Sequence, residues 1–354
     1  MNSTSLRKYL LRKCGLLKGL LPVLLAIGAL TPAAADTAKL GTVDRMPAAV
    51  SFKPPSLAPA VITPATRSLR LRSPAIQDQD TATFDAWSLL TSQMDFALDT
   101  QEPDPDVSLQ RYFISPRDLL DAMPQATLYL PYVTERLVEN DLPPELALLP
   151  FLESAYNPMA RSPRGAAGLW QITGATADGL GLKRDQWWDG RNDVIRSTDA
   201  AIDYLSYLNR RFDGDWLLAL AAYNSGEGTV SRAMARNQRQ GADTDFWNLR
   251  LPAETRIFVP KFLALARLVN ESDLHAGWHP SPETAISTGP IAAVALPEQI
   301  SLQQAARLAD MDYQLLRLLN TGLKQDVTPP DGPHRLVLPQ SAAERLLVEL
   351  APAY

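Results

Sequence analysis

Apolar residues recur every three or four positions from Phe84 to about residue 270, the spacing that turns one side of an α-helix toward a core. One such face runs from Ala201 to Phe212, and Asp213-Gly214 predicts the end of its helix. Another helix is expected over about 254–269. Because no long alternation of apolar and polar residues interrupts this region, the pattern predicts a mainly α domain with a small β-hairpin near 165–173.

Local signals place several helix boundaries. Ser115-Pro116 has the form of a helix start, with a capping Ser and a Pro in the first turn. Ser197 and Asp215 are expected to cap two later helices, because their side chains can accept hydrogen bonds from unpaired backbone N–H groups. Pro124 and Pro131 are expected to break helices, since proline lacks the N–H donor that a helix interior requires.

A second, smaller pattern follows the Pro-containing stretch at 278–290. Residues 291–296 are apolar and strand-like, and residues 335–338 are a second candidate strand. Helices are expected between them, over 302–309 and 313–319. This order predicts a small C-terminal β-α-α-β module over residues 291–340.

The N-terminus has the pattern of a secretory signal. A basic segment precedes an apolar run at 20–30, which is too short to span a bilayer comfortably, and Ala33-Ala34-Ala35 fits a cleavage site. We therefore predict a signal peptide over residues 1–35, with an uncleaved anchor as the alternative. Residues 36–80 are rich in Pro and Ala without a sustained period, and they are interpreted as a linker.

Charge and composition narrow the possible functions. The formal net charge is −5 and becomes −10 without residues 1–35, which carry five basic and no acidic residues. An acidic chain is a poor candidate for binding nucleic acid or an anionic membrane surface. The single cysteine, Cys14, lies before the apolar run, so a processed chain has no disulfide. No metal site, phosphate-binding loop or Ser-His-Asp arrangement stands out, and we predict neither metal nor cofactor.

The strongest chemical signal is the carboxylate of Glu153. It follows the apolar stretch 147–152 and precedes a Gly-rich segment that ends in Trp170-Gln171. A carboxyl group among apolar side chains can have a raised pKa and stay protonated near neutral pH. Cleavage of a glycosidic bond requires a general acid of that kind.

The segment around Glu153 resembles the catalytic segment of the family 1 lytic transglycosylases, which share the goose-type lysozyme fold. Two later segments match that family in the same order, AYNSG at 222–226 and LPAETR at 251–256. The resemblance covers roughly residues 84–340 and also includes WWDGR at 187–191. The matching residues of the first segment are Glu153-Ser154, Ser162, Gly165-Ala166 and Gly168-Leu169-Trp170-Gln171.

The resemblance implies a lysozyme-like transglycosylase domain over residues 84–275, with an N-terminal helical extension. It further implies a periplasmic enzyme, soluble after signal-peptide cleavage, that cuts peptidoglycan glycan strands between N-acetylmuramic acid and N-acetylglucosamine. Glu153 would act first as acid and then as base, so that the muramyl C6 hydroxyl closes a 1,6-anhydro ring. A lysozyme-like hydrolase and a non-catalytic peptidoglycan-binding scaffold are the alternatives. No motif identifies a protein partner.

The resemblance also assigns substrate-binding roles. Ser162 and Gln171 would contact the sugars near the cleaved bond, and Tyr223 and Asn224 would line the groove. Each has a structural alternative, as a loop serine, a hairpin side chain or a core tyrosine. Glu254 either orients the site or forms a surface salt bridge. Trp187 and Trp188 offer either sugar-stacking faces or buried packing.

Two features depart from the families that the sequence resembles. Phe258 stands where the transglycosylases carry a Tyr after the third motif, which removes a hydrogen-bond donor near the expected catalytic carboxyl group. The C-terminal module resembles the LysM glycan-binding module, but Glu298-Gln299 replaces the usual Gly-Asp before its first helix. This LysM-like module is therefore interpreted either as a glycan-binding unit or as a packing domain.

Overall fold

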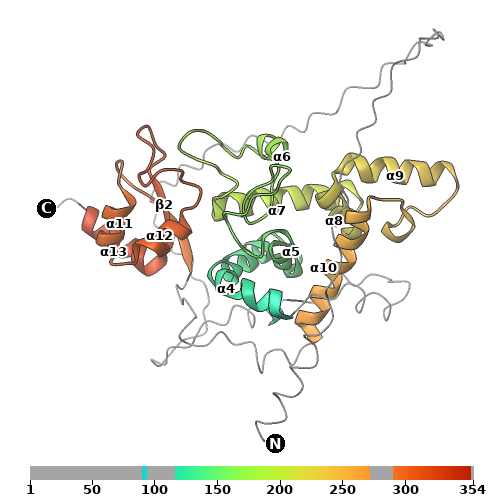
Figure 1. Cartoon of the computed structure of the whole chain (residues 1–354), viewed down its shortest axis with the longest axis horizontal. Helices are drawn as coiled ribbons and strands as arrows, with labels where there is room; N and C mark the ends of the chain where they lie inside the picture. Colours follow the sequence, from blue (N-terminus) through green and yellow to red (C-terminus); the bar gives the residue numbers. More distant parts are fainter. Residues whose placement is uncertain (1–89, 93, 95–115, 272–289, 352–354) are drawn as a thin grey trace, which may run out of the picture. The chain divides into compact units, whose positions relative to one another are not determined.

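The computed structural model describes residues 90–92, 94, 116–271 and 290–351 (Figure 1). The predicted signal peptide, the linker and the capping Ser115 lie outside this range. The described part is mainly helical, as predicted, with one two-stranded sheet near the C-terminus. None of its helices is both long enough and apolar enough to cross a membrane.

Helices make up the regular structure of the larger domain. They surround α8, which is apolar on all sides and buries residues 217–222, as expected for a central helix. Helices α7, α9 and α10 all contact α8. The helical elements of this domain are α4 (Pro116–Glu139), η1 (Pro144–Leu148), α5 (Leu149–Ser154), α6 (Gly174–Gly179), α7 (Val194–Arg211), α8 (Trp216–Ser225), α9 (Glu227–Arg239), η2 (Phe246–Asn248) and α10 (Ala253–Glu271).

Several predicted helix boundaries are confirmed. Asp215 caps α8 by accepting a hydrogen bond from the N–H of Leu218, and Gly226 ends that helix. Asp213 and Gly214 have positive φ angles directly after α7, where they stop the helix. Helix α4 begins at Pro116, the position that the Ser-Pro signal indicated.

Two boundary predictions were wrong. Pro124 and Pro131 both lie inside α4 and do not break it. A buried face that includes Tyr129 and Leu137 holds this helix on the core, and this packing outweighs the hydrogen bonds that the prolines cannot make. Ser197 does not cap α7 either. The cap is Asp193, whose side chain accepts from the N–H of Arg196.

The expected hairpin near 165–173 is present only as isolated antiparallel bridges. Ala167 pairs with Arg161 on one side and with Ile172 on the other. No strand ladder is assigned to this segment, which is instead a compact loop closed by hydrogen bonds. We refer to residues 160–172 as the catalytic-segment loop.

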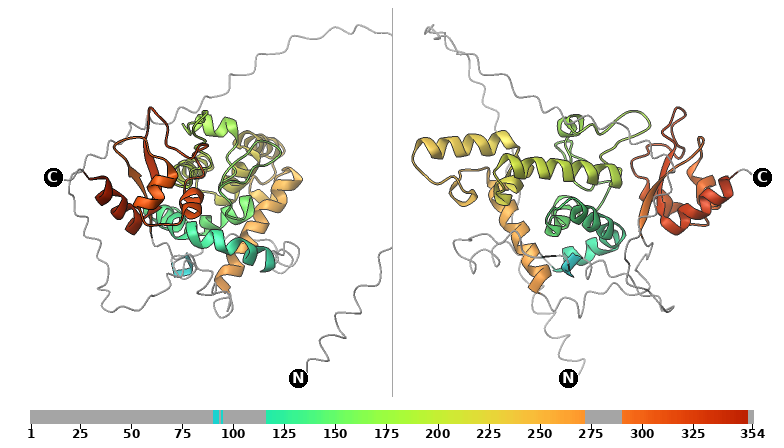
Figure 2. Two further views of the ribbon diagram at one scale, coloured as in Figure 1. Left: turned by 60° about the vertical axis from the view of Figure 1, so that its left-hand side comes forward. Right: turned by 180° about the vertical axis from the view of Figure 1, so that it is seen from behind.

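The C-terminal module has the predicted β-α-α-β order. Strand β1 (Ile291–Ala295) pairs antiparallel with β2 (Arg335–Pro339), with Ala293 opposite Val337. Between them lie α11 (Leu302–Leu308) and α12 (Tyr313–Leu319). A further helix, α13 (Gln340–Leu350), was not predicted and packs on α11 and both strands. Figure 2 shows these orange and red elements as a compact group of their own.

Candidate active site

Glu153 lies near the end of the short helix α5, after a series of buried residues. Leu149, Pro150 and Phe151 of this helix are buried, whereas Glu153 is half-buried and so remains reachable from solvent. The pattern therefore presents one carboxyl group at the edge of an apolar core.

The surroundings of Glu153 alter its acidity strongly. Burial, followed by the negative charge of Glu254, raises the pKa of Glu153 from its ordinary value of 4.5 to about 8. The group is thus largely protonated at neutral pH, as a general acid must be. This direction agrees with the sequence-based expectation, which rested on the neighbouring apolar side chains alone.

A sharp turn directly after α5 fixes the position of Glu153. Ala155 and Tyr156 both have positive φ angles, of 50° and 60°, which non-glycine residues rarely adopt. The fully buried Tyr156 holds the turn by donating a hydrogen bond of 2.7 Å to the carbonyl oxygen of Ala147. The packing and hydrogen bonding of this tyrosine hold the strained turn in place.

Ser154 joins α5 to the catalytic-segment loop. Its hydroxyl is 2.8 Å from the carbonyl oxygen of Leu169 and 3.1 Å from that of Pro150. The two residues of the Glu-Ser pair therefore have different roles. Glu153 carries the ionisable group, and Ser154 ties its helix to the Gly-rich segment.

Ser162 and Gln171 shape the loop itself. The Ser162 hydroxyl accepts a hydrogen bond of 3.1 Å from the N–H of Ala166. The amide nitrogen of Gln171 donates to the carbonyl oxygens of Gly168 and Ala160, at 2.9 and 3.3 Å. Neither residue hydrogen-bonds Glu153 within the described part of the chain. Their substrate-binding roles remain predictions.

Trp170 anchors the loop to two helices. Its buried ring nitrogen donates a hydrogen bond of 3.0 Å to Thr198 of α7. Its carbonyl oxygen accepts a hydrogen bond of 2.7 Å from the hydroxyl of Tyr223 in α8. Burial, followed by the charge of the Glu153 carboxylate, raises the pKa of Tyr223 well above its ordinary range. Tyr223 is therefore close enough to Glu153 to be affected by its charge.

The other two predicted residues lie on α8 and α10. Asn224 accepts a hydrogen bond of 2.8 Å from the hydroxyl of Thr255, through its side-chain oxygen. The neighbouring Glu254 is exposed and forms an ion pair of 3.0 Å with Arg164 of the loop. Glu254 therefore forms the expected surface salt bridge, and its charge also raises the pKa of Glu153. Its role in orienting the site stays a prediction.

Three residues for which the sequence analysis predicted no role contact the residues of the candidate site. Thr198 and Thr255 are buried partners of Trp170 and Asn224, and Arg164 is the partner of Glu254. Thr255 lies in the LPAETR segment that matches the family, but nothing in the sequence shows that its partner is Asn224. Nothing in the sequence marks Thr198 or Arg164, because each pairs with a residue far along the chain. Phe258 is half-buried and packs against the main core.

The two tryptophans are placed differently from each other. Trp188 packs against the core of the C-terminal module, and the guanidinium of Arg335 lies 5.9 Å from its ring centre. Trp187 is half-buried and lines a cavity of about 370 Å³ together with Lys183 and Pro330. Packing is thus the role observed for Trp188.

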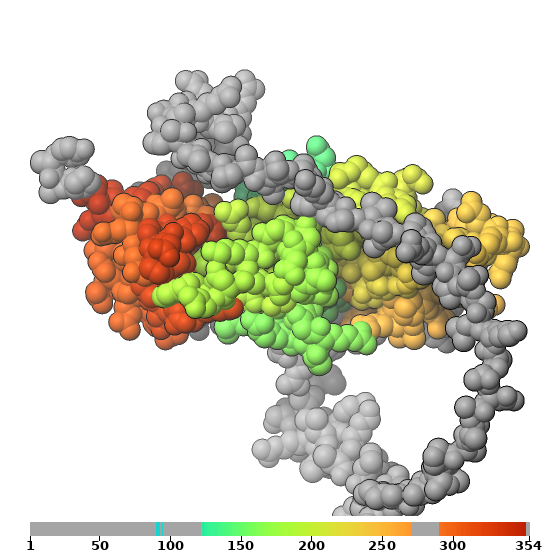
Figure 3. Space-filling view, turned by 90° about the horizontal axis from the view of Figure 1, so that it is seen from above, coloured from blue at the N-terminus to red at the C-terminus, as the bar shows by residue number. Residues whose placement is uncertain are grey.

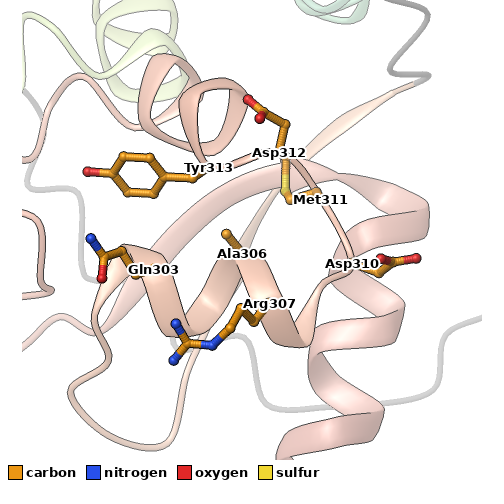
Figure 4. A pocket seen from close by; sticks show the side chains of 7 residues that line it. All are labelled: Gln303, Ala306, Arg307, Asp310, Met311, Asp312 and Tyr313. Atoms are coloured by element: carbon orange, nitrogen blue, oxygen red, sulfur yellow. The ribbon is translucent and has the colours of Figure 1, made fainter.

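A larger cavity of about 710 Å³ lies in the C-terminal module, between α11 and α12 (Figure 4). Figure 4 shows Tyr313 and Gln303 on one side of it, whereas Asp310 points the opposite way. The polar groups do not converge on one point, so this cavity lacks the arrangement of a small-molecule site. Within the described residues, no group of three or more His, Cys, Asp or Glu side chains could hold a metal ion.

We expect the charge of Glu254 to be visible in the pH dependence of the activity that the resemblance implies for Glu153. Because that charge raises the pKa of Glu153, Glu254→Gln should lower it and move the alkaline limb of the rate profile to lower pH. Arg164→Gln removes the cation beside Glu254. This variant should leave the alkaline limb of the rate profile at its wild-type pH or move it to higher pH. The measurement is kcat/KM across pH 5–9 on purified peptidoglycan, the substrate that the resemblance implies. Equal shifts in both variants would contradict this prediction.

Two family models match separate parts of the chain. Residues 134–246 match the family model of the transglycosylase SLT domain, and residues 291–354 match that of the LysM-like domain of lytic transglycosylase MltD. The chain thus has a segment similar to the transglycosylase SLT domain, followed by one similar to the LysM-like domain of MltD.

Three relatives share parts of their sequence with this chain. The chain is 37% identical over 242 residues to membrane-bound lytic murein transglycosylase D of Escherichia coli K12, covering 68% of this chain and 53% of that protein. It is 48% identical over 111 residues to a putative tributyltin chloride resistance protein of an Alteromonas strain, covering 31% and 54%. It is 37% identical over 116 residues to membrane-bound lytic murein transglycosylase F of Yersinia pestis, covering 30% and 23%. The chain spans about half the length of the first of these relatives.

Proposed function

We propose that this protein is a lytic transglycosylase that cleaves peptidoglycan glycan strands between N-acetylmuramic acid and N-acetylglucosamine. The observation that carries the proposal is the raised pKa of Glu153, about 8, beside a loop built from the matching transglycosylase motif. An acid that is protonated at neutral pH and still reachable from solvent suits donation to a glycosidic oxygen.

In the first step Glu153 donates its proton to the oxygen between the two sugars. The bond from that oxygen to C1 of the muramyl residue breaks, and the departing sugar leaves with a hydroxyl group. Positive charge then develops at the muramyl C1, where the N-acetyl group of the substrate can stabilise it. The negative charge left on Glu153 also favours this cation, because the site is poorly solvated.

In the second step the Glu153 carboxylate takes the proton of the muramyl C6 hydroxyl. The freed oxygen pair bonds to C1 and closes the 1,6-anhydro ring, so Glu153 returns to its protonated form and no water is consumed. One carboxyl group serves both transfers, so the mechanism needs no second catalytic carboxylate, unlike most glycosidases. Glu254 is exposed and paired with Arg164, so its part in the mechanism is to raise the pKa of Glu153 by its charge rather than to transfer a proton.

The products distinguish this proposal from its alternatives. Purified protein is incubated with peptidoglycan, and the released fragments are identified by mass spectrometry. We expect fragments that end in 1,6-anhydromuramic acid. Reducing muramic acid ends would instead show a hydrolase, in which water replaces the C6 hydroxyl. Release of no fragments would favour a non-catalytic scaffold.

The same proposal includes a periplasmic location and a glycan partner. The basic and apolar pattern of residues 1–35 supports export, and cleavage there would give a soluble protein. The LysM-like match of residues 291–354 supports contact of the C-terminal module with peptidoglycan strands.

A further inference from the structure

A short polar segment of the transglycosylase domain is buried to an unusual degree. Asp189, Arg191, Asn192 and Asp193 are all almost inaccessible to solvent, although each carries a charged or amide side chain. Buried groups of this kind are costly unless they are paired. Every one of them has partners, and those partners lie in two different parts of the molecule.

The first set of partners belongs to the neighbourhood of the catalytic-segment loop. Arg191 donates a hydrogen bond of 2.8 Å to the carbonyl oxygen of Gly165, and Asn192 donates one of 2.6 Å to that of Pro158. Asp189 pairs with Arg191 at 2.8 Å and with Arg161 at 3.2 Å. The loop that follows Glu153 is therefore supported from behind by segment 189–193.

The second set of partners belongs to the C-terminal module. Arg335 of β2 forms an ion pair with Asp193, and the two side chains are only 11% and 3% exposed. Thr321 donates a hydrogen bond of 2.7 Å to the carbonyl oxygen of Asn192, and the N–H of Asp189 donates one of 2.9 Å to the carbonyl oxygen of Gly322. In the space-filling view the module is drawn in orange and red, and residues of the larger domain are drawn in green (Figure 3).

The fit at this contact is close. A Cβ atom added to Gly322 would lie 2.9 Å from the Cβ of Asp193, so the backbone of the module touches segment 189–193 directly. Asp193 also caps α7. That helix carries Thr198, the partner of Trp170 in the catalytic-segment loop. A shift of Asp193 would therefore reach the loop along two routes, through Arg191 and through α7.

We propose that Arg335, with Thr321 and Gly322, acts as a positioning residue for the Glu153 site, by holding segment 189–193 against the back of the catalytic-segment loop. The C-terminal module then has a task in catalysis that does not require it to bind glycan. The effect that we expect on kcat rests on the proposed transglycosylase function. The effect that we expect on the order of the catalytic-segment loop does not depend on that function.

The first test is amide hydrogen exchange on the full-length protein. Arg335→Met removes the charge but keeps much of the side-chain length, and it leaves Asp193 buried without its partner. We expect faster exchange in peptides covering 160–172 and 189–193. The matched control is Arg345→Met, because among the described residues Arg345 donates its hydrogen bond to the carbonyl oxygen of Ala309, inside the module. Unchanged exchange at 160–172 in Arg335→Met would overturn the proposal.

The second test separates positioning from glycan binding by the module. With a misplaced loop, kcat on soluble glycan fragments should fall about tenfold or more, since displacements of about 1 Å can cost 10²-fold. A module that only binds glycan would change KM and leave kcat intact, and that result would overturn the proposal. Arg335→Lys keeps the charge without the planar fork, and it should retain an intermediate kcat.

A double-mutant cycle completes the design. Asp193→Asn can still cap α7 but loses the charge. If the ion pair acts as a unit, the double variant Asp193→Asn/Arg335→Met should lose no more kcat than the worse single variant. Additive losses would show that the pair is not the link. Inactivity of the wild type would reject the proposed function, whereas the exchange result would still decide the positioning role.

Discussion

Replacing Glu153 by Gln should lower the turnover of peptidoglycan by at least about 10²-fold, because the amide can neither donate nor accept the catalytic proton. Gln has nearly the same shape, so peptidoglycan binding should stay near that of the wild type. The measurement is the initial rate of fragment release together with sedimentation of the protein with insoluble peptidoglycan. Full activity of the variant would show that another group carries the proton.

The stability of this variant gives an independent check with a defined sign. Glu153 has a pKa of about 8 in the folded protein against 4.5 ordinarily, so the folded state keeps a proton that the unfolded state releases between these values. The cost to stability therefore grows as pH rises from 4.5 toward 8, and it is fully present above 8. Glu153→Gln removes this cost, so its Tm should exceed that of the wild type at pH 8 and approach it near pH 5.

A matched control is available on α4. Burial, followed by the charge of Glu139, also raises the pKa of Glu135, which lies outside the catalytic motifs. Glu135→Gln is the same chemical change and should leave turnover within a few-fold of the wild type. A similar loss in both variants would point to a general effect of charge rather than to catalysis by Glu153.

The parts of the fold that depend on neighbouring residues were open to prediction from sequence. Asp215 and Asp213-Gly214 act on the backbone next to them, and they bound α8 and α7 as expected. The order of strands and helices in the C-terminal module follows in the same way from short apolar runs. Glu153 could be singled out as a candidate because its apolar neighbours and its motif lie beside it in the sequence.

Features that depend on distant contacts could not be predicted. Pro124 and Pro131 stay inside α4 because of packing that the local pattern does not show. Asp193, rather than Ser197, begins α7, and its other partner is Arg335, which lies 142 residues away in the sequence. The contacts of Thr198 with Trp170 and of Thr255 with Asn224 could not be predicted for the same reason.

Two glycines of the catalytic-segment loop should respond very differently to the same substitution. Gly165 and Gly168 have nearly equal φ angles, of 82° and 83°, in the region that side chains disfavour. Each change to Ala should therefore cost about 1–2 kcal/mol of stability from backbone strain. Their surroundings differ, because a Cβ at Gly165 meets nothing within 4 Å, whereas one at Gly168 would lie 1.7 Å from the carbonyl oxygen of Arg191.

We expect Gly168→Ala to be the more damaging variant by a wide margin. Arg191 cannot retreat easily, because its side chain is held by Asp189 and by the carbonyl oxygen of Gly165. The loop must move instead, adding about 1–3 kcal/mol of overpacking to the strain. Because this movement displaces the loop beside Glu153, turnover should fall about 10²-fold. Gly165→Ala should stay within a few-fold of wild type in turnover. Thermal unfolding and initial rates of both variants measure the contrast, and equal effects would show that the contact with Arg191 does not hold the loop in place.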